Sequence, residues 1–197
     1  LDKKTTKGLS CSVELIDLAT RDIITRADAD SAGNYFLTVP VGKDYAFNVN
    51  RRGYLFFSDN FLMTTHTPDS IYEKNIALQP IETNASIVLK NIFFDVNKFE
   101  LKPESQVELD KLVQMLTENP TLKIEISGYT DNIGKPTENL TLSNNRAKAV
   151  VNYLVNKKIA VIRLTAKGYG ETKSLADNKT EDGRAMNRRT EMKVVSQ

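Results

Sequence analysis

The sequence GYTDNIGKPTENLTLSNNRAKAV, residues 128–150, joins a strand end, a sharp turn and the start of a helix. Asp131 and Gly134 are residue types that favour turns. The second half of the stretch has the apolar spacing of a helix, and this helix carries Arg146. The stretch therefore predicts that a carboxylate and a guanidinium lie at the same end of one helix.

Opposite charges at a fixed spacing suit a small zwitterion, because a carboxylate pairs with an ammonium group and a guanidinium binds a carboxylate through parallel hydrogen bonds. Thr130, Asn139 and Ser143 add polar groups around the pair. The stretch holds no paired nucleophile and base, which covalent catalysis needs. We expect a binding site, although Asp131 alone could cap the turn and Arg146 alone could form a surface ion pair.

Strands and helices alternate in the sequence on both sides of this stretch. Pro103 suits the first turn of a helix, and the apolar residues after it have helical spacing: Leu109, Leu112, Val113 and Leu116. Strands are expected at residues 87–94, 122–126, 165–168 and 192–195, with a helical turn at 184–188. The predicted fold class is α+β, with helices packed on one face of a mixed sheet.

The N-terminal part has a different pattern, in which apolar residues fall two apart between turn signals. These residues are Val13 and Leu15, then Tyr35, Leu37 and Val39, then Tyr45, Phe47 and Val49. The pattern predicts a small antiparallel β-sandwich over residues 1–80. Residues 81–86 are polar and lack periodicity, so we assign them to a linker before a second domain at 87–197.

Composition excludes several classes of site. The chain has 197 residues, a formal net charge of +2, one cysteine and one histidine. A single cysteine excludes an internal disulfide and a cysteine-based zinc cluster, and Cys11 is interpreted as a buried strand residue. His66, the single histidine, lies in a polar stretch and is interpreted as a solvated loop residue. No cofactor or metal is predicted. No apolar run approaches the roughly 18 residues of a spanning helix, and no signal peptide opens the chain. Because the sequence starts at Leu1, already near an expected strand, we interpret the chain as a fragment or processed form of a longer protein.

The residues at 130–147 follow the pattern TD-x-x-G-x4-N-x-x-LS-x-x-RA. This pattern resembles the OmpA-like peptidoglycan-binding domain. The flanking sequences NIFFDVNKFELKP (91–103), AKGYGET (166–172) and DNKTEDGRAMNRR (177–189) agree with it, so the resemblance spans about residues 87–196. It implies that the ligand is the diaminopimelate of the peptidoglycan stem peptide, with Asp131 on its side-chain ammonium and Arg146 on the adjacent carboxylate.

The same resemblance implies a wider pocket around these two charges. The further pocket residues are Thr130, Asn139, Asp95, Asn97 and Arg188. Arg189 is expected to turn outward, because successive strand residues face opposite sides of a sheet.

The N-terminal sequence TRADADSAGNYFLTVPVGKDYAFNVNRRGY, residues 25–54, resembles the carboxypeptidase regulatory-like (transthyretin-like) sandwich. The matching positions are Asp30, Gly33, Tyr35, Phe36, Gly42, Tyr45, Gly53 and Tyr54. The resemblance implies a spacer or interaction module that lacks its first strand. The two modules in series resemble envelope lipoproteins of Bacteroidetes, including those associated with type IX secretion.

The predicted function is a periplasmic module that fastens an outer-membrane-associated protein or secretion assembly to peptidoglycan. Two alternatives remain: a protein–protein scaffold with a vestigial pocket, and a wall-remodelling enzyme. The enzyme is disfavoured because it needs a metal site or an activated nucleophile. A nucleic-acid partner is not expected, because acidic residues alternate with the arginines of residues 181–191.

Overall fold

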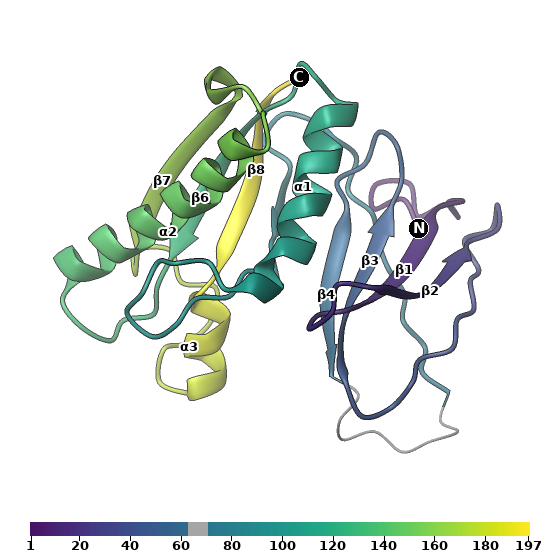
Figure 1. Ribbon diagram of the computed structural model, residues 1–197, viewed down its shortest axis with the longest axis horizontal. Coiled ribbons are helices and arrows are strands. Elements are labelled where there is room, and N and C mark those ends of the chain that lie inside the picture. The colour runs from purple at the N-terminus through teal and green to yellow at the C-terminus, as the bar shows by residue number, and fades with distance from the viewer. Residues whose placement is uncertain (63–70) are drawn as a thin grey trace. The chain divides into compact units, whose positions relative to one another are not determined.

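The structure is a computed structural model that describes residues 1–62 and 71–197, so His66 lies outside the described residues. The chain divides into two compact units, Leu1–Ile81 and Glu82–Gln197 (Figure 1). Each unit has a β-sheet of its own.

The first unit is built on a four-stranded antiparallel sheet with the strand order β2-β1-β3-β4. The strands are β1 (Ser12–Asp17), β2 (Ile23–Asp28), β3 (Asp44–Asn50) and β4 (Phe57–Leu62). Val13 lies opposite Val49, and Leu15 lies opposite Phe47. The strands expected around these apolar pairs are therefore confirmed.

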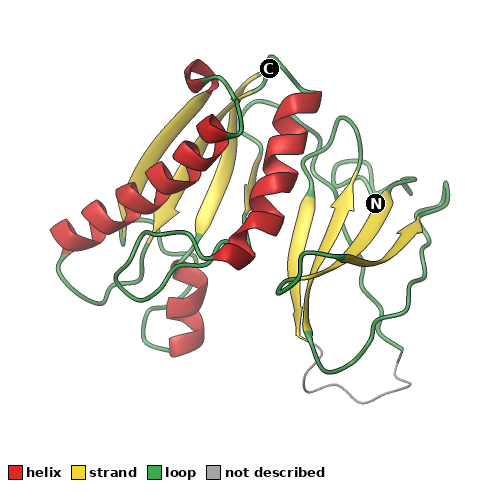
Figure 2. Ribbon diagram, viewed as in Figure 1, coloured by secondary structure: helices red, strands yellow, loops and turns green. Residues whose placement is uncertain are grey.

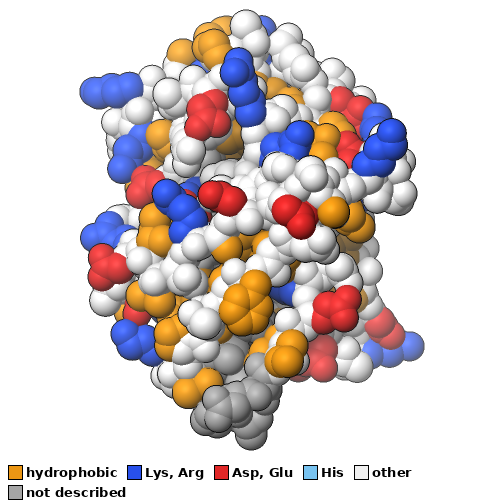
Figure 3. All heavy atoms as spheres, turned by 90° about the vertical axis from the view of Figure 1, so that its right-hand side faces the viewer, with side chains coloured by type: hydrophobic (Ala, Val, Ile, Leu, Met, Phe, Trp, Pro, Cys, Tyr) orange, Lys and Arg blue, Asp and Glu red, His pale blue; other side chains and the backbone are white. Residues whose placement is uncertain are grey.

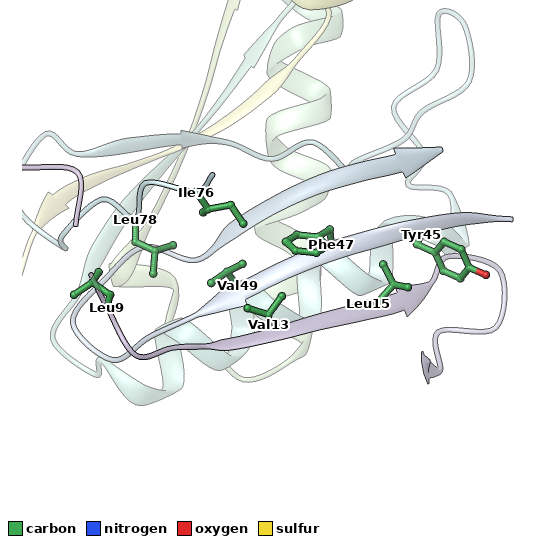
Figure 4. Close-up of a cluster of buried hydrophobic side chains, with 8 residues drawn as sticks. All are labelled: Leu9, Val13, Leu15, Tyr45, Phe47, Val49, Ile76 and Leu78. Carbon is green, nitrogen blue, oxygen red and sulfur yellow. The ribbon is translucent and has the colours of Figure 1, made fainter. Parts of the chain in front are cut away.

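A cluster of buried side chains forms the core of this unit (Figure 4). Its members are Leu9, Val13, Leu15, Tyr45, Phe47, Val49, Ile76 and Leu78. Cys11, which precedes β1, is half-buried against this cluster.

The strand expected at residues 35–39 does not form, although its alternate side chains Tyr35, Leu37 and Val39 pack against the core cluster. An extended chain presents every second side chain to one side whether or not its backbone bonds to a neighbouring strand. Alternation therefore predicted which residues are buried here and failed to predict the hydrogen-bonded ladder. In the described residues of this unit, irregular chain covers the cluster in place of a second sheet.

The second unit has a mixed four-stranded sheet in the order β5-β8-β6-β7. Only β6 and β7 run parallel to each other. The strands are β5 (Ser86–Val88), β6 (Lys123–Tyr129), β7 (Leu164–Gly170) and β8 (Thr190–Ser196); the helices are α1 (Gln106–Glu118), α2 (Pro136–Asn156) and α3 (Glu181–Asn187), with 3-10 turns at Pro103–Ser105 and Val161–Arg163. The α+β class expected from the sequence is confirmed.

The strand expected at residues 87–94 is shorter than predicted, since β5 ends at Val88. The backbone of Phe93 bonds instead to the start of the first helical segment. Its N–H donates to Ser105 Oγ (2.9 Å), and its carbonyl accepts from the Lys102 N–H (3.1 Å). The backbone groups of Phe93 are thus satisfied without a partner strand.

Two glycines let α2 lie directly on β6 and β7 (Figure 2). A Cβ atom at Gly128 would be 2.2 Å from the Ser143 carbonyl oxygen, and one at Gly168 would be 2.3 Å from the Asn144 nitrogen. The sequence predicted that Ala147, Val150, Val151 and Leu154 of this helix face the core. Ala147, Val150 and Leu154 are fully buried, whereas Val151 is only partly buried. This close seating brings the end of β6 next to the first turns of α2.

No helix among the described residues combines the length and the apolar character needed to cross a membrane.

Candidate functional site

Asp131 begins the turn between β6 and α2, and its carboxylate shapes that turn. The Ile133 N–H donates to Asp131 Oδ1 (3.0 Å), and Gly134 follows with φ +100°, a conformation that glycine adopts without strain. Asp131 is only 8 % exposed. The structural role of capping the turn is therefore real, and it uses one of the two carboxylate oxygens.

The other oxygen of Asp131 is bound by Arg188, which comes from the end of α3. Arg188 Nη1 lies 2.7 Å from Asp131 Oδ2, and Arg188 Nη2 lies 2.6 Å from Glu181 Oε1. The hydrogen bond to Asp131 is the main cause that raises the pKa of Arg188. The structure thus brings Asp131 and Arg188 together as partners of each other.

Arg146 is held beside this pair by backbone carbonyls. Its Nε donates to the Lys98 carbonyl (2.9 Å), its Nη2 donates to the Asp95 carbonyl (3.2 Å), and its guanidinium lies 4.9 Å from the centre of the Phe94 ring. Burial lowers the pKa of Arg146, and the positive charge of Arg188 lowers it further, while Asp131 raises it. The three charged groups therefore share one electrostatic environment.

Asp95 and Asn97 lie at the edge of this group. The Asp95 carboxylate forms ion pairs with Lys98 (3.4 Å) and Lys102 (3.3 Å), and these lysines lower its pKa, with Lys102 as the larger cause. Only the backbone carbonyl of Asp95 meets Arg146. Asn97 has φ +57°, a left-handed conformation that asparagine tolerates. Both residues shape the loop that holds Arg146.

Thr130 and Asn139 are buried next to Asp131, with 4 % and 6 % exposed. The Thr130 N–H donates to the Gly170 carbonyl (3.0 Å), while its hydroxyl oxygen is buried without a hydrogen-bond partner among the described residues. Asn139 Nδ2 donates to Glu171 Oε2 (2.7 Å) and to the Ile133 carbonyl (3.1 Å). Thr130 thus keeps an unused polar group at the site, whereas the Asn139 amide holds the turn.

Ser143, which the sequence placed among the polar groups of the site, is fully buried and structural. Its Oγ accepts the Gly170 N–H (2.9 Å).

Arg189 was expected to turn outward, and the structure differs from this expectation. Its side chain is 6 % exposed, lies 3.7 Å over the Tyr129 ring and pairs with Glu191 (2.6 Å). It does turn away from Arg188, but a ring and a carboxylate cover it, so it does not reach solvent.

Sequence reasoning missed two carboxylates, Glu171 and Glu181, that contact the predicted site residues. Glu181 lies seven positions before Arg188, a spacing that places both on one side of a helix. That signal was available in the sequence. No local signal pairs Glu171 with Asn139, because 32 positions separate them.

Residues 93–188 match the family model described as "OmpA family". The second unit contains an OmpA-like domain.

The OmpA-like domain has relatives among outer-membrane proteins. The chain is 41 % identical over 107 residues to outer membrane porin F of Pseudomonas fluorescens, which covers 54 % of this chain and 33 % of the porin. It is 39 % identical over 125 residues to outer membrane protein A of Bordetella avium, which covers 61 % of this chain and 64 % of that protein. The matched region is thus about a third of the porin's length.

Among solved structures, a putative MotB like protein from Desulfovibrio vulgaris is similar to the chain. The TM-score is 0.50 at 29 % identity, with 54 % of this chain and 68 % of that chain covered.

Proposed function

We propose that the OmpA-like domain binds peptidoglycan non-covalently, through the diaminopimelate residue of the stem peptide. The family match over residues 93–188 supports this proposal, because the site residues lie within those bounds. The observation that carries it is the meeting of Asp131, Arg146 and Arg188 in one electrostatic environment.

Arg146 is the proposed partner of the ligand carboxylate. A guanidinium has five N–H donors in a planar fork. Backbone carbonyls accept one hydrogen bond from Nε and one from Nη2 of Arg146. Among the described residues, Nη1 has no hydrogen-bond partner. The free edge of the fork can therefore give a carboxylate two parallel hydrogen bonds.

Asp131 is the proposed partner of the ligand ammonium, although Arg188 already binds it. An ionised carboxylate has about four lone-pair sites, and Asp131 uses two of them. The ammonium group can thus join Arg188 on the same carboxylate without breaking the ion pair.

In the cell, we propose that this binding fastens an outer-membrane-associated protein or secretion assembly to the wall from the periplasm. The first unit would be a carboxypeptidase regulatory-like spacer or interaction module, as in the Bacteroidetes lipoproteins associated with type IX secretion. We propose binding without catalysis. The part of the chain that the structure describes contains no group of three or more His, Cys, Asp or Glu residues that could hold a metal ion.

Titration calorimetry with three stem peptides tests the carboxylate assignment. The peptides carry diaminopimelate, amidated diaminopimelate or lysine. Hydrogen bonds to charged groups contribute about 1.5–3 kcal/mol each, so amidation and Arg146→Ala should each weaken binding by roughly ten- to a hundredfold. The two losses should not add, because both remove the same contact. Equal affinities for the three peptides would refute the role of Arg146.

Asp131→Asn tests the ammonium assignment. The asparagine oxygen still accepts the Ile133 N–H, so the turn is kept while the charge is lost. Affinity for the diaminopimelate peptide should fall roughly tenfold or more. Asp177→Asn is the matched control, because Asp177 caps an exposed turn in the same way, accepting the Lys179 N–H (3.0 Å). Wild-type affinity in Asp131→Asn would place the site elsewhere.

A further inference from the structure

Glu171 follows β7 at a point where three elements of the OmpA-like domain meet. The preceding residue, Gly170, has φ +54°, and a Cβ atom there would be 3.1 Å from the Leu140 nitrogen of α2. Gly170 also donates its N–H to Ser143 Oγ (2.9 Å) and accepts the Thr130 N–H (3.0 Å). These contacts fix the backbone before Glu171 against both α2 and the end of β6.

From this position the Glu171 carboxylate reaches the Asn139 amide. The amide nitrogen has two hydrogens to donate. Its two short contacts go to Glu171 Oε2 (2.7 Å) and the Ile133 carbonyl (3.1 Å), with a longer one to the Asp131 carbonyl (3.4 Å). Both hydrogens are therefore committed inside the protein, and none is left for a ligand.

The other two acceptors of this amide, the carbonyls of Ile133 and Asp131, lie on the turn that carries Asp131. Asn139 thus ties the turn to Glu171, and the same turn holds the Asp131 carboxylate through the Ile133 N–H (3.0 Å). A hydrogen bond to an ionised carboxylate is shorter and stronger than one between neutral groups. The Glu171 contact, at 2.7 Å, is the shortest of the three.

We propose that Glu171 is a positioning residue that acts through Asn139 to hold the turn and so orient Asp131 for the ligand. This inference rests on the function proposed above, and it changes the role of Asn139 from a ligand contact to a support of the turn. Glu171 thereby joins Asp131 and Arg146 as a determinant of affinity without touching the ligand.

Three variants separate the hydrogen bond from the charge. Glu171→Ala removes both, whereas Glu171→Gln removes the charge but keeps an oxygen that accepts from Asn139. Glu138→Gln is the matched control, because Glu138 is the exposed neighbour of Asn139 on α2 and, among the described residues, pairs only with Lys135 (3.1 Å). Each variant is measured in the full chain by amide hydrogen exchange at Ile133 and by calorimetry with the diaminopimelate stem peptide.

Glu171→Ala should raise the exchange rate of the Ile133 N–H by about tenfold and weaken binding about five- to thirtyfold. Glu138→Gln should stay within about twofold of the wild type in both measurements. Glu171→Gln should lie between the wild type and Glu171→Ala, since a neutral acceptor keeps the hydrogen bond at about half its strength. Partial recovery by glutamine is the result that a positioning role requires.

Two results would overturn the inference. If Glu171→Ala leaves the exchange of Ile133 unchanged, Glu171 does not hold the turn. If Glu171→Gln binds as weakly as Glu171→Ala while exchange is unchanged, the charge acts on the ligand directly. Failure of the wild-type chain to bind any stem peptide would instead refute the proposed function, and the exchange rates would still decide whether Glu171 holds the turn.

Discussion

Tyr129 shows how strongly one position is constrained by its neighbours. The Arg189 guanidinium lies 3.7 Å from its ring centre, and the Tyr169 ring stacks on it at 5.2 Å with 8° between the planes. Its hydroxyl donates to Glu191 Oε2 (3.2 Å). Burial, and then the charge of Glu191, raises the pKa of Tyr129 to about 12. The ionised form is therefore disfavoured in the folded protein.

This raised pKa predicts an alkaline dependence of stability. A tyrosine in the unfolded chain ionises near pH 10. The contribution of Tyr129 to stability is therefore fully present below about pH 10 and is lost as the pH rises through the folded pKa of about 12. Absorbance titration of tyrosinate in the wild type and in Tyr129→Phe measures this directly. The difference between the two curves should rise near pH 12, and a difference centred near pH 10 would contradict the packing around the ring.

At the scale of elements, the seating of α2 decides where the site forms. Gly128 and Gly168 bring the helix backbone against β6 and β7, and Gly170 brings the end of β7 against the first turns of α2. The Asp131 turn spans the short gap between β6 and α2, so its geometry depends on this separation.

Gly128→Ala should therefore damage the fold and the site together. The new Cβ would lie 2.2 Å from the Ser143 carbonyl oxygen, so α2 must move away from the sheet. Overpacking of this kind costs about 1–3 kcal/mol or more. Amide hydrogen exchange in β6 should become faster and binding of the stem peptide weaker. Thr165→Ala, an exposed change on β7, is the control and should leave both unchanged.

At the scale of the whole molecule, the chain consists of two units with separate sheets. Apolar side chains that remain on the surface of the first unit include Phe36 (80 % exposed), Ile23 and Ile24. Figure 3 shows hydrophobic side chains scattered among charged ones on one face of the molecule. Single exposed apolar residues are common on proteins and need no functional explanation. The proposed ligand contacts all lie in the second unit.

The second unit should therefore fold and bind alone when it starts at Glu82. Asn84 donates its N–H to the Val194 carbonyl (2.9 Å), and Ala85 accepts the Val194 N–H (2.8 Å). A fragment of residues 82–197 keeps these bonds, and one of residues 87–197 loses them. In a sacculus pull-down, 82–197 should bind like the full chain, 87–197 should be less stable to heat, and 1–81 should stay in the supernatant. Weaker binding by 82–197 would mean that the first unit contributes to affinity.

Most elements were predictable from the sequence, because periodicity reports which side of a local segment is buried. The alternation at residues 122–126 and the helical spacing of Ala147, Val150 and Leu154 identified β6 and α2. These are local properties, and neighbouring residues in the sequence suffice to express them. The sequence was expected to place Asp131 and Arg146 at the same end of a helix, but α2 begins at Pro136, so Arg146 lies in the middle of the helix.

The partners across the site depended on tertiary structure. Antiparallel pairing of β8 with β6 lets the Tyr129 N–H donate to the Arg189 carbonyl (3.0 Å), and this brings Arg188 to Asp131, 57 positions away in the sequence. The same pairing buries Arg189 on Tyr129, and the end of β7 brings Glu171 to Asn139. Periodicity carries no information about which strand lies beside which. Ion pairs that join different strands and helices are therefore set by strand order, which only the folded chain defines.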